Sequence, residues 1–529
     1  MIIESTVRLV SHTATHNPVV FVWATLTLVA AAYVVLTEVY RARQRIPSFP
    51  GPPGWPIVGN IPQIQSNAAE QYRQWSQQYG AVFQIMLGNV PVIVVNSAKS
   101  AREIFGTHSQ ALASRPEFYT FHKIVSSTAG TTIGTSPFSD SLKRRRKGAA
   151  SALNKPSIAT YIEHIDVETT DFLREFLVYG AAGAKKVDPM PMIQRLSLSL
   201  ALTLNWGVRM KSQDDELFAE ITHVEEEVSK FRSTTGNLQD YIPILRYVPD
   251  VFGGGRRAAA RDMRRRRDIY LQRLNDDLDR RLDQGWQGKC IQANVIRDSE
   301  AKLSKEELTS ISLTMLSGGL DTLTTLVAWS MALLSERQDV QDKAFEEIGK
   351  VYAQDKPLCD ADDDQGIAYI VALVKELLRY YTVLRLCLPR ATVRDIVYEG
   401  KTIPAGSVVF LNAWACNMDP AVWKDPMVFR PERWLDQPDA PLFTYGLGYR
   451  MCAGSLLANR EMYTIYLRLL AAFRIQDAQG EAGSRLSSDP VHGQDDPTQL
   501  VTVPRRMKVR LVPRNEKALA QALEEAATA

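Results

Sequence analysis

The sequence predicts a mainly α-helical protein with small β-sheets, preceded by one transmembrane helix at the N-terminus. Three observations support this prediction. Residues 18–37 form an uncharged apolar run, residues 81–95 alternate as a short hairpin does, and residues 158–355 consist of long amphipathic runs with few strand signals. A chain of 529 residues with 45% hydrophobic content is long enough to bury one large core or two.

The N-terminal apolar run is expected to be an uncleaved membrane anchor. Its twenty residues, 18–37, match the ~20 needed to cross the hydrocarbon layer as a helix. Arg41, Arg43 and Arg45 follow it, whereas only Arg8 precedes it, so the positive-inside rule places everything after residue 40 in the cytosol. A cleaved signal peptide is the alternative, but its apolar region is usually shorter and its charges come first.

The segment after the anchor is rich in proline. Five prolines between residues 46 and 56 exclude helix and strand and predict a stiff extended connector between the bilayer and the globular body, with a proline-rich ligand for a partner domain as the alternative. The expected domains are a lumenal segment 1–17, an anchor 18–40, a basic and proline-rich hinge 41–56, a catalytic domain 57–514 and a C-terminal tail 515–529.

Composition excludes several classes of protein. The 62 basic and 59 acidic residues nearly balance, which gives no support for a nucleic-acid partner. The five cysteines are odd in number, scattered and without CxxC spacing. Such usage is typical of a reducing compartment and indicates neither a disulfide scaffold nor a zinc site.

One apolar helical run, 311–331, has an unusual centre. It contains Gly318, Gly319, Asp321 and Thr322, where alanine and leucine would be more stable. Residues that weaken a helix, when they stand inside a buried one, indicate a functional site. The alternative is a glycine-mediated helix crossing with a satisfied Asp–Thr pair.

The glycine-rich bend at 445–454 delivers one cysteine, Cys452, to the start of an apolar helical run. A thiolate requires an open, electropositive setting, which neighbouring glycines, Arg450 and a helix N-terminus supply together. The bend therefore predicts a haem-thiolate loop, in which backbone N–H groups tune the sulfur. A buried free cysteine is the alternative. The bend contains Tyr445, Gly446, Gly448, Arg450, Cys452 and Gly454.

These motifs resemble those of the cytochrome P-450 superfamily over residues 47–512. The family's cysteine loop, Phe-x-x-Gly-x-Arg-x-Cys-x-Gly, is matched here except that Tyr445 replaces Phe. The resemblance implies the cytochrome P-450 fold, with haem b as cofactor and Cys452 as the axial ligand of its iron. It also implies that Gly318 and Gly319 open the central helix for dioxygen, Thr322 hydrogen-bonds the oxygen or its water, and Asp321 helps to relay protons.

The resemblance also assigns charged residues around the cofactor. Glu376 and Arg379, three apart on one helical face, would form a buried triad with Arg433, which lies in a stretch resembling the family's Pro-Glu-Arg-Phe meander. That triad would brace the cysteine loop and serve haem incorporation and folding. The implied partners of the haem propionates are Arg390, Arg450 and Arg146. The register among residues 144–146 stays open because Leu142 stands where the family has Trp.

The substrate pocket is implied by family position. It would be lined by residues 118–137, 313–320, 382–388 and 498–501, which are mostly apolar. Residues 135–147, 382–386 and 410–420 are similar to fungal membrane-anchored phenylacetate hydroxylases and to relatives that hydroxylate cresols and benzyl alcohols. The substrate candidates are Val383, Leu384 and Arg385, of which Arg385 would pair either with a substrate carboxylate or with a haem propionate.

The expected function is a monooxygenase that hydroxylates a small phenolic or arylacetic metabolite with O2, in secondary metabolism or aromatic catabolism. No dinucleotide fingerprint is present, so electrons must come from another protein. The resemblance implies an NADPH-cytochrome reductase, with cytochrome b5 as a second donor, at the endoplasmic reticulum membrane. A haem-thiolate isomerase or dehydratase and a non-catalytic haem-binding membrane protein are the alternatives; Asp321 and Thr322 argue against both.

Overall fold

The computed structural model describes residues 18–126, 131–248, 255–297, 302–353, 355–477 and 488–528. The long helices are α2 (Pro18–Gln44), α3 (Ala68–Tyr79), α5 (Asp140–Ala152), α7 (Ile162–Tyr179), α8 (Met190–Trp206), α9 (Glu216–Phe231), α11 (Arg256–Asp283), α13 (Lys305–Glu336), α14 (Gln338–Ile348), α15 (Ala368–Tyr381), α18 (Ser455–Ala472) and α19 (Glu516–Thr528). The short helices are α4 (Ala98–Ala101), α6 (Lys155–Ala159), α10 (Leu238–Tyr241), α12 (Ile291–Arg297), α16 (Ala413–Asn417), α17 (Arg433–Asp436) and η1 to η5 (Ile61–Gln63, Arg102–Thr107, Tyr119–Val125, Pro243–Arg246, Gly448–Arg450).

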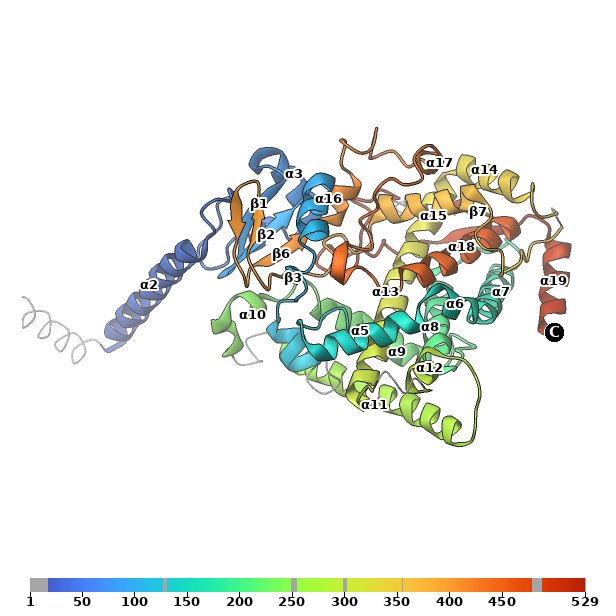
Figure 1. Cartoon of the computed structure of the whole chain (residues 1–529), viewed down its shortest axis with the longest axis horizontal. Helices are drawn as coiled ribbons and strands as arrows, with labels where there is room; N and C mark the ends of the chain where they lie inside the picture. Colours follow the sequence, from blue (N-terminus) through green and yellow to red (C-terminus); the bar gives the residue numbers. More distant parts are fainter. Residues whose placement is uncertain are drawn as a thin grey trace, which may run out of the picture.

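Helix α13 runs through the middle of the helical body (Figure 1). It begins at a capping box, in which the Ser304 hydroxyl accepts from the Glu307 amide and the Glu307 carboxylate accepts from the Ser304 amide. It packs against α8 along most of its length and also contacts α5, α9 and α15. Most of its residues are buried, because they form the boundary between the two largest hydrophobic clusters of the molecule. The helix predicted over 311–331 is therefore the core of the fold.

The strands are β1 (Val82–Leu87), β2 (Val90–Val95), β3 (Arg390–Ala391), β4 (Ile396–Tyr398), β5 (Lys401–Ile403), β6 (Val408–Leu411), β7 (Phe473–Asp477) and β8 (Val509–Pro513). They form one four-stranded sheet, β1-β2-β6-β3, and two antiparallel pairs, β4-β5 and β7-β8. The predicted hairpin is confirmed, since β1 pairs antiparallel with β2 across a turn at residues 88–89. The four-stranded sheet lies beside α2 and α3, away from the helical body (Figure 1).

Helix α2 projects from the body (Figure 1) and is long and apolar enough to cross a membrane; its apolar window is entirely exposed. Among the described residues, α13 passes the same test, but most of it lies in the core. The helix extends past residue 40 to Gln44, because the buried Arg41 pairs with Glu38 at 2.6 Å and donates to the Trp55 carbonyl. The exposed part of α2 is suited to a bilayer, whereas its last turn is attached to the globular body.

The proline-rich segment packs onto the body instead of spacing it from α2. Ile46 and Phe49 are buried in a cluster with β-sheet residues. The Gln84 side chain, on β1, accepts a hydrogen bond from the Ile46 amide and donates to the Ile46 and Phe49 carbonyls. These contacts fix the direction in which α2 leaves the body.

The C-terminal segment, predicted as a tail, forms α19 in the structure. Leu519 and Leu523 of this helix are buried in the main hydrophobic cluster, against α7. Their four-residue spacing puts both on one helical face. The catalytic fold therefore extends through α19.

Candidate functional site

The cysteine loop is a tight bend that places Cys452 just before α18. Gly446 and Gly448 adopt positive φ angles of +70° and +63°, which favour glycine. A Cβ on Gly448 would also lie 2.3 Å from the Phe105 carbonyl oxygen. The Cys452 amide donates to the Tyr445 carbonyl at 3.0 Å, which closes the bend.

The thiol of Cys452 is accessible, although protein surrounds it. Burial raises its pKa, while a hydrogen bond from the Gly454 amide and the positive charge of Arg146 oppose that shift. Tyr445 is half-buried beside it, and its hydroxyl donates to the Asn459 side chain at 2.7 Å. A β-carbon on Gly454 would meet nothing within 4 Å. The cysteine is thus held by the hydrogen-bonded bend and remains accessible.

The predicted oxygen-binding residues lie on α13, and the helix continues unbroken through them. The two glycines have different surroundings: a Cβ on Gly319 would touch Ala201 of α8 at 3.6 Å, whereas one on Gly318 would meet open space. Thr322 donates its hydroxyl proton to the Gly318 carbonyl at 2.7 Å. Gly319 therefore serves a close helix crossing, while Gly318 and Thr322 border the open space.

Asp321 pairs with an arginine from another helix, not with Thr322. Its carboxylate lies 2.9 Å from Nη2 of Arg232, at the end of α9, and both side chains are nearly buried. Burial raises the pKa of Asp321 to about 7; Arg232 counteracts this shift and Glu225 adds to it. A carboxyl group with a pKa near 7 can both accept and donate a proton at neutral pH.

Four arginines gather around the cysteine loop: Arg115, Arg146, Arg390 and Arg450. Arg450 donates to backbone carbonyls between Ala113 and Ser136, and Arg115 donates to the Pro389 carbonyl at 2.8 Å. Burial lowers the pKa of each, and for Arg115 and Arg450 the neighbouring arginines lower it further.

Among the described residues, none of the groups that shift the pKa values of these four arginines is a carboxylate, so their positive charge is not compensated. Arg390 donates to the Leu447 carbonyl at 2.5 Å, and its Nη1 is buried without a partner in the described part of the chain. Buried cations without acids are costly and are suited to a bound anion. The cluster therefore fits a cofactor that carries carboxylates.

The structure distinguishes the three arginines of α5 whose register the sequence left open. Arg144 pairs with Glu307 at 2.6 Å, and Arg145 donates to the Ser310 hydroxyl at 2.6 Å. Arg146 alone turns to the cysteine loop, where its guanidinium lies 5.6 Å from the Tyr449 ring centre. Arg115 was missed by the sequence analysis, because no local pattern marks it.

Glu376, Arg379 and Arg433 come together behind the cysteine loop and are fully buried or nearly so. Both Glu376 carboxylate oxygens accept from Arg379 at 2.8 Å, and one accepts from Arg433 at 3.2 Å. The Trp434 indole N–H donates to the same carboxylate at 3.0 Å. Trp434 stands where the family has Phe, and here its indole adds a donor to the triad.

The triad is connected to the cysteine loop through Asn417. Arg379 donates to the Asn417 carbonyl at 3.1 Å. The Asn417 side chain accepts from the Phe443 amide at 2.9 Å and donates to the Thr444 hydroxyl at 3.1 Å. Hydrogen bonds thus run without interruption from the triad to the residues that precede Tyr445.

The three predicted substrate residues have different surroundings. Val383 is buried and Leu384 is half-buried. Arg385 is buried with its guanidinium 4.5 Å from the Trp414 ring centre, and it donates to the Pro490 carbonyl. Its Nε and Nη1 have no partner among the described residues. Burial lowers the pKa of Arg385, and the nearby carboxylates of Glu70 and Asp489 offset part of this decrease.

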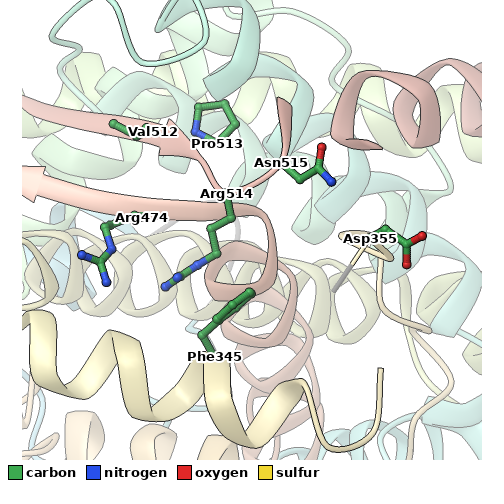
Figure 2. A pocket seen from close by; sticks show the side chains of 7 residues that line it. All are labelled: Phe345, Asp355, Arg474, Val512, Pro513, Arg514 and Asn515. Atoms are coloured by element: carbon green, nitrogen blue, oxygen red, sulfur yellow. The ribbon is translucent and has the colours of Figure 1, made fainter. Parts of the chain in front are cut away.

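A separate cleft of about 550 Å³ lies at the far end of α18, about 27 Å from Cys452 at 1.5 Å per residue. Figure 2 shows Arg514 beside Phe345, with Arg474 on the same side of the cleft. Arg474 pairs with Asp342, and Arg514 donates to the Leu470 carbonyl at 2.8 Å. Both cations are occupied by the protein, and the cleft has no connection with the cysteine loop.

Comparison with known proteins identifies the family. The family model described as Cytochrome P450 matches residues 49–500. The chain is a cytochrome P450. It is 61% identical to 3-hydroxyphenylacetate 6-hydroxylase of Emericella nidulans over 99% of this chain and 100% of that protein. It is 41% identical to phenylacetate 2-hydroxylase of the same organism, over 93% and 96% of the two chains.

A third relative, a cytochrome P450 monooxygenase of Mycosarcoma maydis, is 39% identical over 92% of this chain and 91% of that protein. The predicted fold, the mostly helical cytochrome P450 fold with small sheets, is confirmed. The chain is an oxidoreductase of the monooxygenase type with a haem-thiolate cofactor, and it uses dioxygen and a redox partner. The accessible cysteine, the open space and the uncompensated arginines fit that cofactor.

Proposed function

We propose that this cytochrome P450 hydroxylates the ring of a small arylacetic acid, with phenols as the related class. The observation that carries the proposal is the 61% identity, over essentially the whole chain, to a 3-hydroxyphenylacetate hydroxylase. A second hydroxylase of an arylacetate, at 41% identity, supports the same class. The reaction consumes the arylacetate, O2, two electrons and two protons, and yields the hydroxylated acid and water.

The cofactor we propose is haem b, with Cys452 as the ligand of its iron. When bound, haem would activate dioxygen, so that one of the two oxygen atoms of O2 enters the aromatic ring. A coordinating thiol loses its proton, and the Gly454 amide and Arg146 favour that charged form here. Arg115, Arg390 and Arg450 would hold the two propionates, because all three carry buried positive charge and Arg390 has a buried Nη1 without a partner among the described residues.

Proton delivery is proposed for Asp321 and Thr322. The Thr322 hydroxyl is one residue from a carboxyl group whose pKa is about 7, so a proton can be held at Asp321 and passed on near neutral pH. Gly318 carries no side chain, and its carbonyl anchors the Thr322 hydroxyl at the edge of the open space. The triad around Glu376 is assigned to folding and cofactor incorporation, because it is buried behind the loop.

For the redox partner we propose an NADPH-cytochrome reductase, with cytochrome b5 as a second donor. Lys143 and Arg144 of α5 have about half of their side chains exposed, near the residues that surround Cys452. Such a face is complementary to an acidic flavoprotein. We place the enzyme in the endoplasmic reticulum membrane through α2, with the catalytic domain in the cytosol, on the basis of the three arginines that follow the apolar run.

The test uses the full-length, haem-loaded protein. We expect a thiolate-type Soret band in the reduced, carbon-monoxide-bound spectrum and a spin shift on titration with phenylacetate or 3-hydroxyphenylacetate. Reconstitution with a reductase and NADPH should yield a ring-hydroxylated product. The Cys452→Ala variant should lose the thiolate band, whereas Cys359→Ala, a buried cysteine outside the loop, should keep it. Turnover without O2 would indicate an isomerase or dehydratase instead.

A further inference from the structure

The Asp321–Arg232 pair lies beside two segments expected to line the substrate pocket, 118–137 and 498–501, and Asp321 directly follows a third, 313–320. The guanidinium of Arg232 stands 6.0 Å from the ring centre of Phe121, which belongs to the loop 118–137. Its Nη2 bonds Asp321 on the central helix. The adjacent Ser233 donates its hydroxyl to the Thr498 carbonyl, in the turn 498–501.

Arg232 has donors that the protein does not use. A guanidinium has five N–H bonds, and Asp321 takes one of them through Nη2. The Nε of Arg232 is buried without a partner in the described residues. One side of the guanidinium meets the ring of Phe121, which belongs to a hydrophobic cluster with Phe231 and Leu320. A cation beside an aromatic wall fits a ligand that combines an aromatic ring with one carboxylate.

Arg385 is the rival cation, and its neighbours differ. It lies against Trp414 of α16 and the Pro490 carbonyl, near Glu70 of α3 and Asp489. Arg385 itself lies in the expected pocket segment 382–388, but none of these four neighbours belongs to such a segment. Arg232, in contrast, contacts Phe121 in one pocket segment and Asp321, the residue next to a second, and it is adjacent to a residue that bonds a third.

We propose that Arg232 binds the carboxylate of the arylacetic substrate and shares its guanidinium between that carboxylate and Asp321. This inference rests on the proposed function, because it names the group that recognises the same substrate class. The ring of the substrate would then pack against the apolar cluster around Phe121, and the acid group would fix which end of the molecule points to the haem.

Because Asp321 and the substrate carboxylate would share the guanidinium of Arg232, substrate binding should depend on pH. Asp321 faces Arg232 and Ser229, which favour its charged form, and Glu225 and Glu226, which oppose it. Glu225 is itself held by the Tyr270 and Ser317 hydroxyls at 2.6 and 2.5 Å. A second carboxylate on the same guanidinium raises the pKa of Asp321 further, so the enzyme takes up a proton when the acid binds. The affinity for the acid therefore falls as pH rises above about 7.

The experiment measures dissociation constants by spin-state titration of the haem-loaded enzyme. The ligands are phenylacetate and phenylacetamide, which share a skeleton and differ in charge. Arg232→Gln should weaken the binding of phenylacetate by roughly 10- to 100-fold, as expected for lost hydrogen bonds to a charged group. The same variant should weaken the binding of phenylacetamide by no more than about twofold. Arg232→Lys should recover part of the loss. Arg385→Gln, the matched control, should leave the acid-to-amide ratio unchanged.

A pH series adds an independent readout. Between pH 7 and 9 the dissociation constant for phenylacetate should rise by up to about tenfold per unit, while that for phenylacetamide stays flat. Asp321→Asn should abolish the rise. The inference would be overturned if Arg232→Gln weakened the binding of acid and amide equally. It would also be overturned if only Arg385→Gln changed the ratio of the two dissociation constants. A wild-type enzyme that binds no arylacetate would instead overturn the proposed substrate class.

Discussion

Glu376 and the cysteine loop are both surrounded by buried arginines, but only the first group contains an acid of the protein. At Glu376, two arginines, an indole N–H and a backbone amide converge on one carboxylate, which offsets part of the positive charge and accepts their hydrogen bonds, and we call this the matched group. Around the cysteine loop, Arg115, Arg390 and Arg450 face carbonyl oxygens and one another. The acid of the matched group comes from the chain itself, whereas the unmatched group around the cysteine loop has the character of a site for an anion from outside.

Removing the acid from the matched group has the largest expected effect. Glu376→Gln keeps the shape of the side chain and leaves Arg379 and Arg433 uncompensated, at a cost of about 3–5 kcal/mol in the free energy of unfolding. Urea denaturation followed by tryptophan fluorescence measures it. Glu346→Gln, at an exposed pair on α14, should leave the free energy of unfolding essentially unchanged. A small effect at Glu376 would mean that the triad is dispensable for folding.

Glu461 sharpens the comparison, because it is a buried carboxyl group with no arginine paired to it in the part of the chain that the structure describes. Burial raises its pKa from 4.5 to about 8. Between these two values the unfolded chain releases the proton and the folded chain keeps it. The free energy of unfolding should therefore fall by roughly 1.4 kcal/mol per pH unit as pH rises, and no further above pH 8.

The Glu461→Gln variant removes that titration. It should be more stable than the wild type by about 4–5 kcal/mol at pH 8 and equal to it near pH 4.5. Thermal or urea unfolding at several pH values measures the difference. Parallel pH profiles for the two proteins would show that Glu461 is charged or solvated in the folded state.

In the unmatched group, substitution should affect the cofactor more than the fold. Arg390→Leu removes a buried guanidinium with an unpartnered nitrogen, so the haem-free protein should be unchanged or slightly more stable. Haem binding should weaken by about 1.5–3 kcal/mol, the contribution of a hydrogen bond to a charged group. Transfer of haem to apomyoglobin measures this. Destabilisation of the haem-free protein without faster haem loss would contradict the assignment.

The smallest effect is expected on α5, where neighbouring arginines provide a matched pair of variants. Arg146→Leu should accelerate haem loss by only a few-fold, corresponding to about 1 kcal/mol, because this residue lies at the rim and donates weakly to the Met451 carbonyl at 3.5 Å. Arg144→Leu, which removes a pair with Glu307, should not change haem retention. If the two effects were reversed, the register that we infer from the structure would be wrong.

The sequence alone was sufficient for features encoded in neighbouring residues. The hairpin turned at residues 88–89 and the central helix followed from periodicity, and the cysteine loop from its glycines. Arg115 and Arg232 were not predictable in this way, since their significance comes from partners far along the chain, such as Asp321 for Arg232. The packing of α19 was missed for a similar reason, because two leucines mark a face but not the surface that it covers.

The attachment of α2 through Arg41, Ile46 and Phe49 has a geometric consequence. Because the end of α2 is attached to the β-sheet, the helix cannot rotate freely relative to the globular body. With α2 in a bilayer, every copy of the enzyme would therefore meet the membrane at the same tilt. A reductase confined to the same membrane, as proposed above, would search for this enzyme in two dimensions instead of three, and it would meet the α5 side at a constant height above the lipid. The attachment of α2 to the body would thereby help to set how often electrons are delivered.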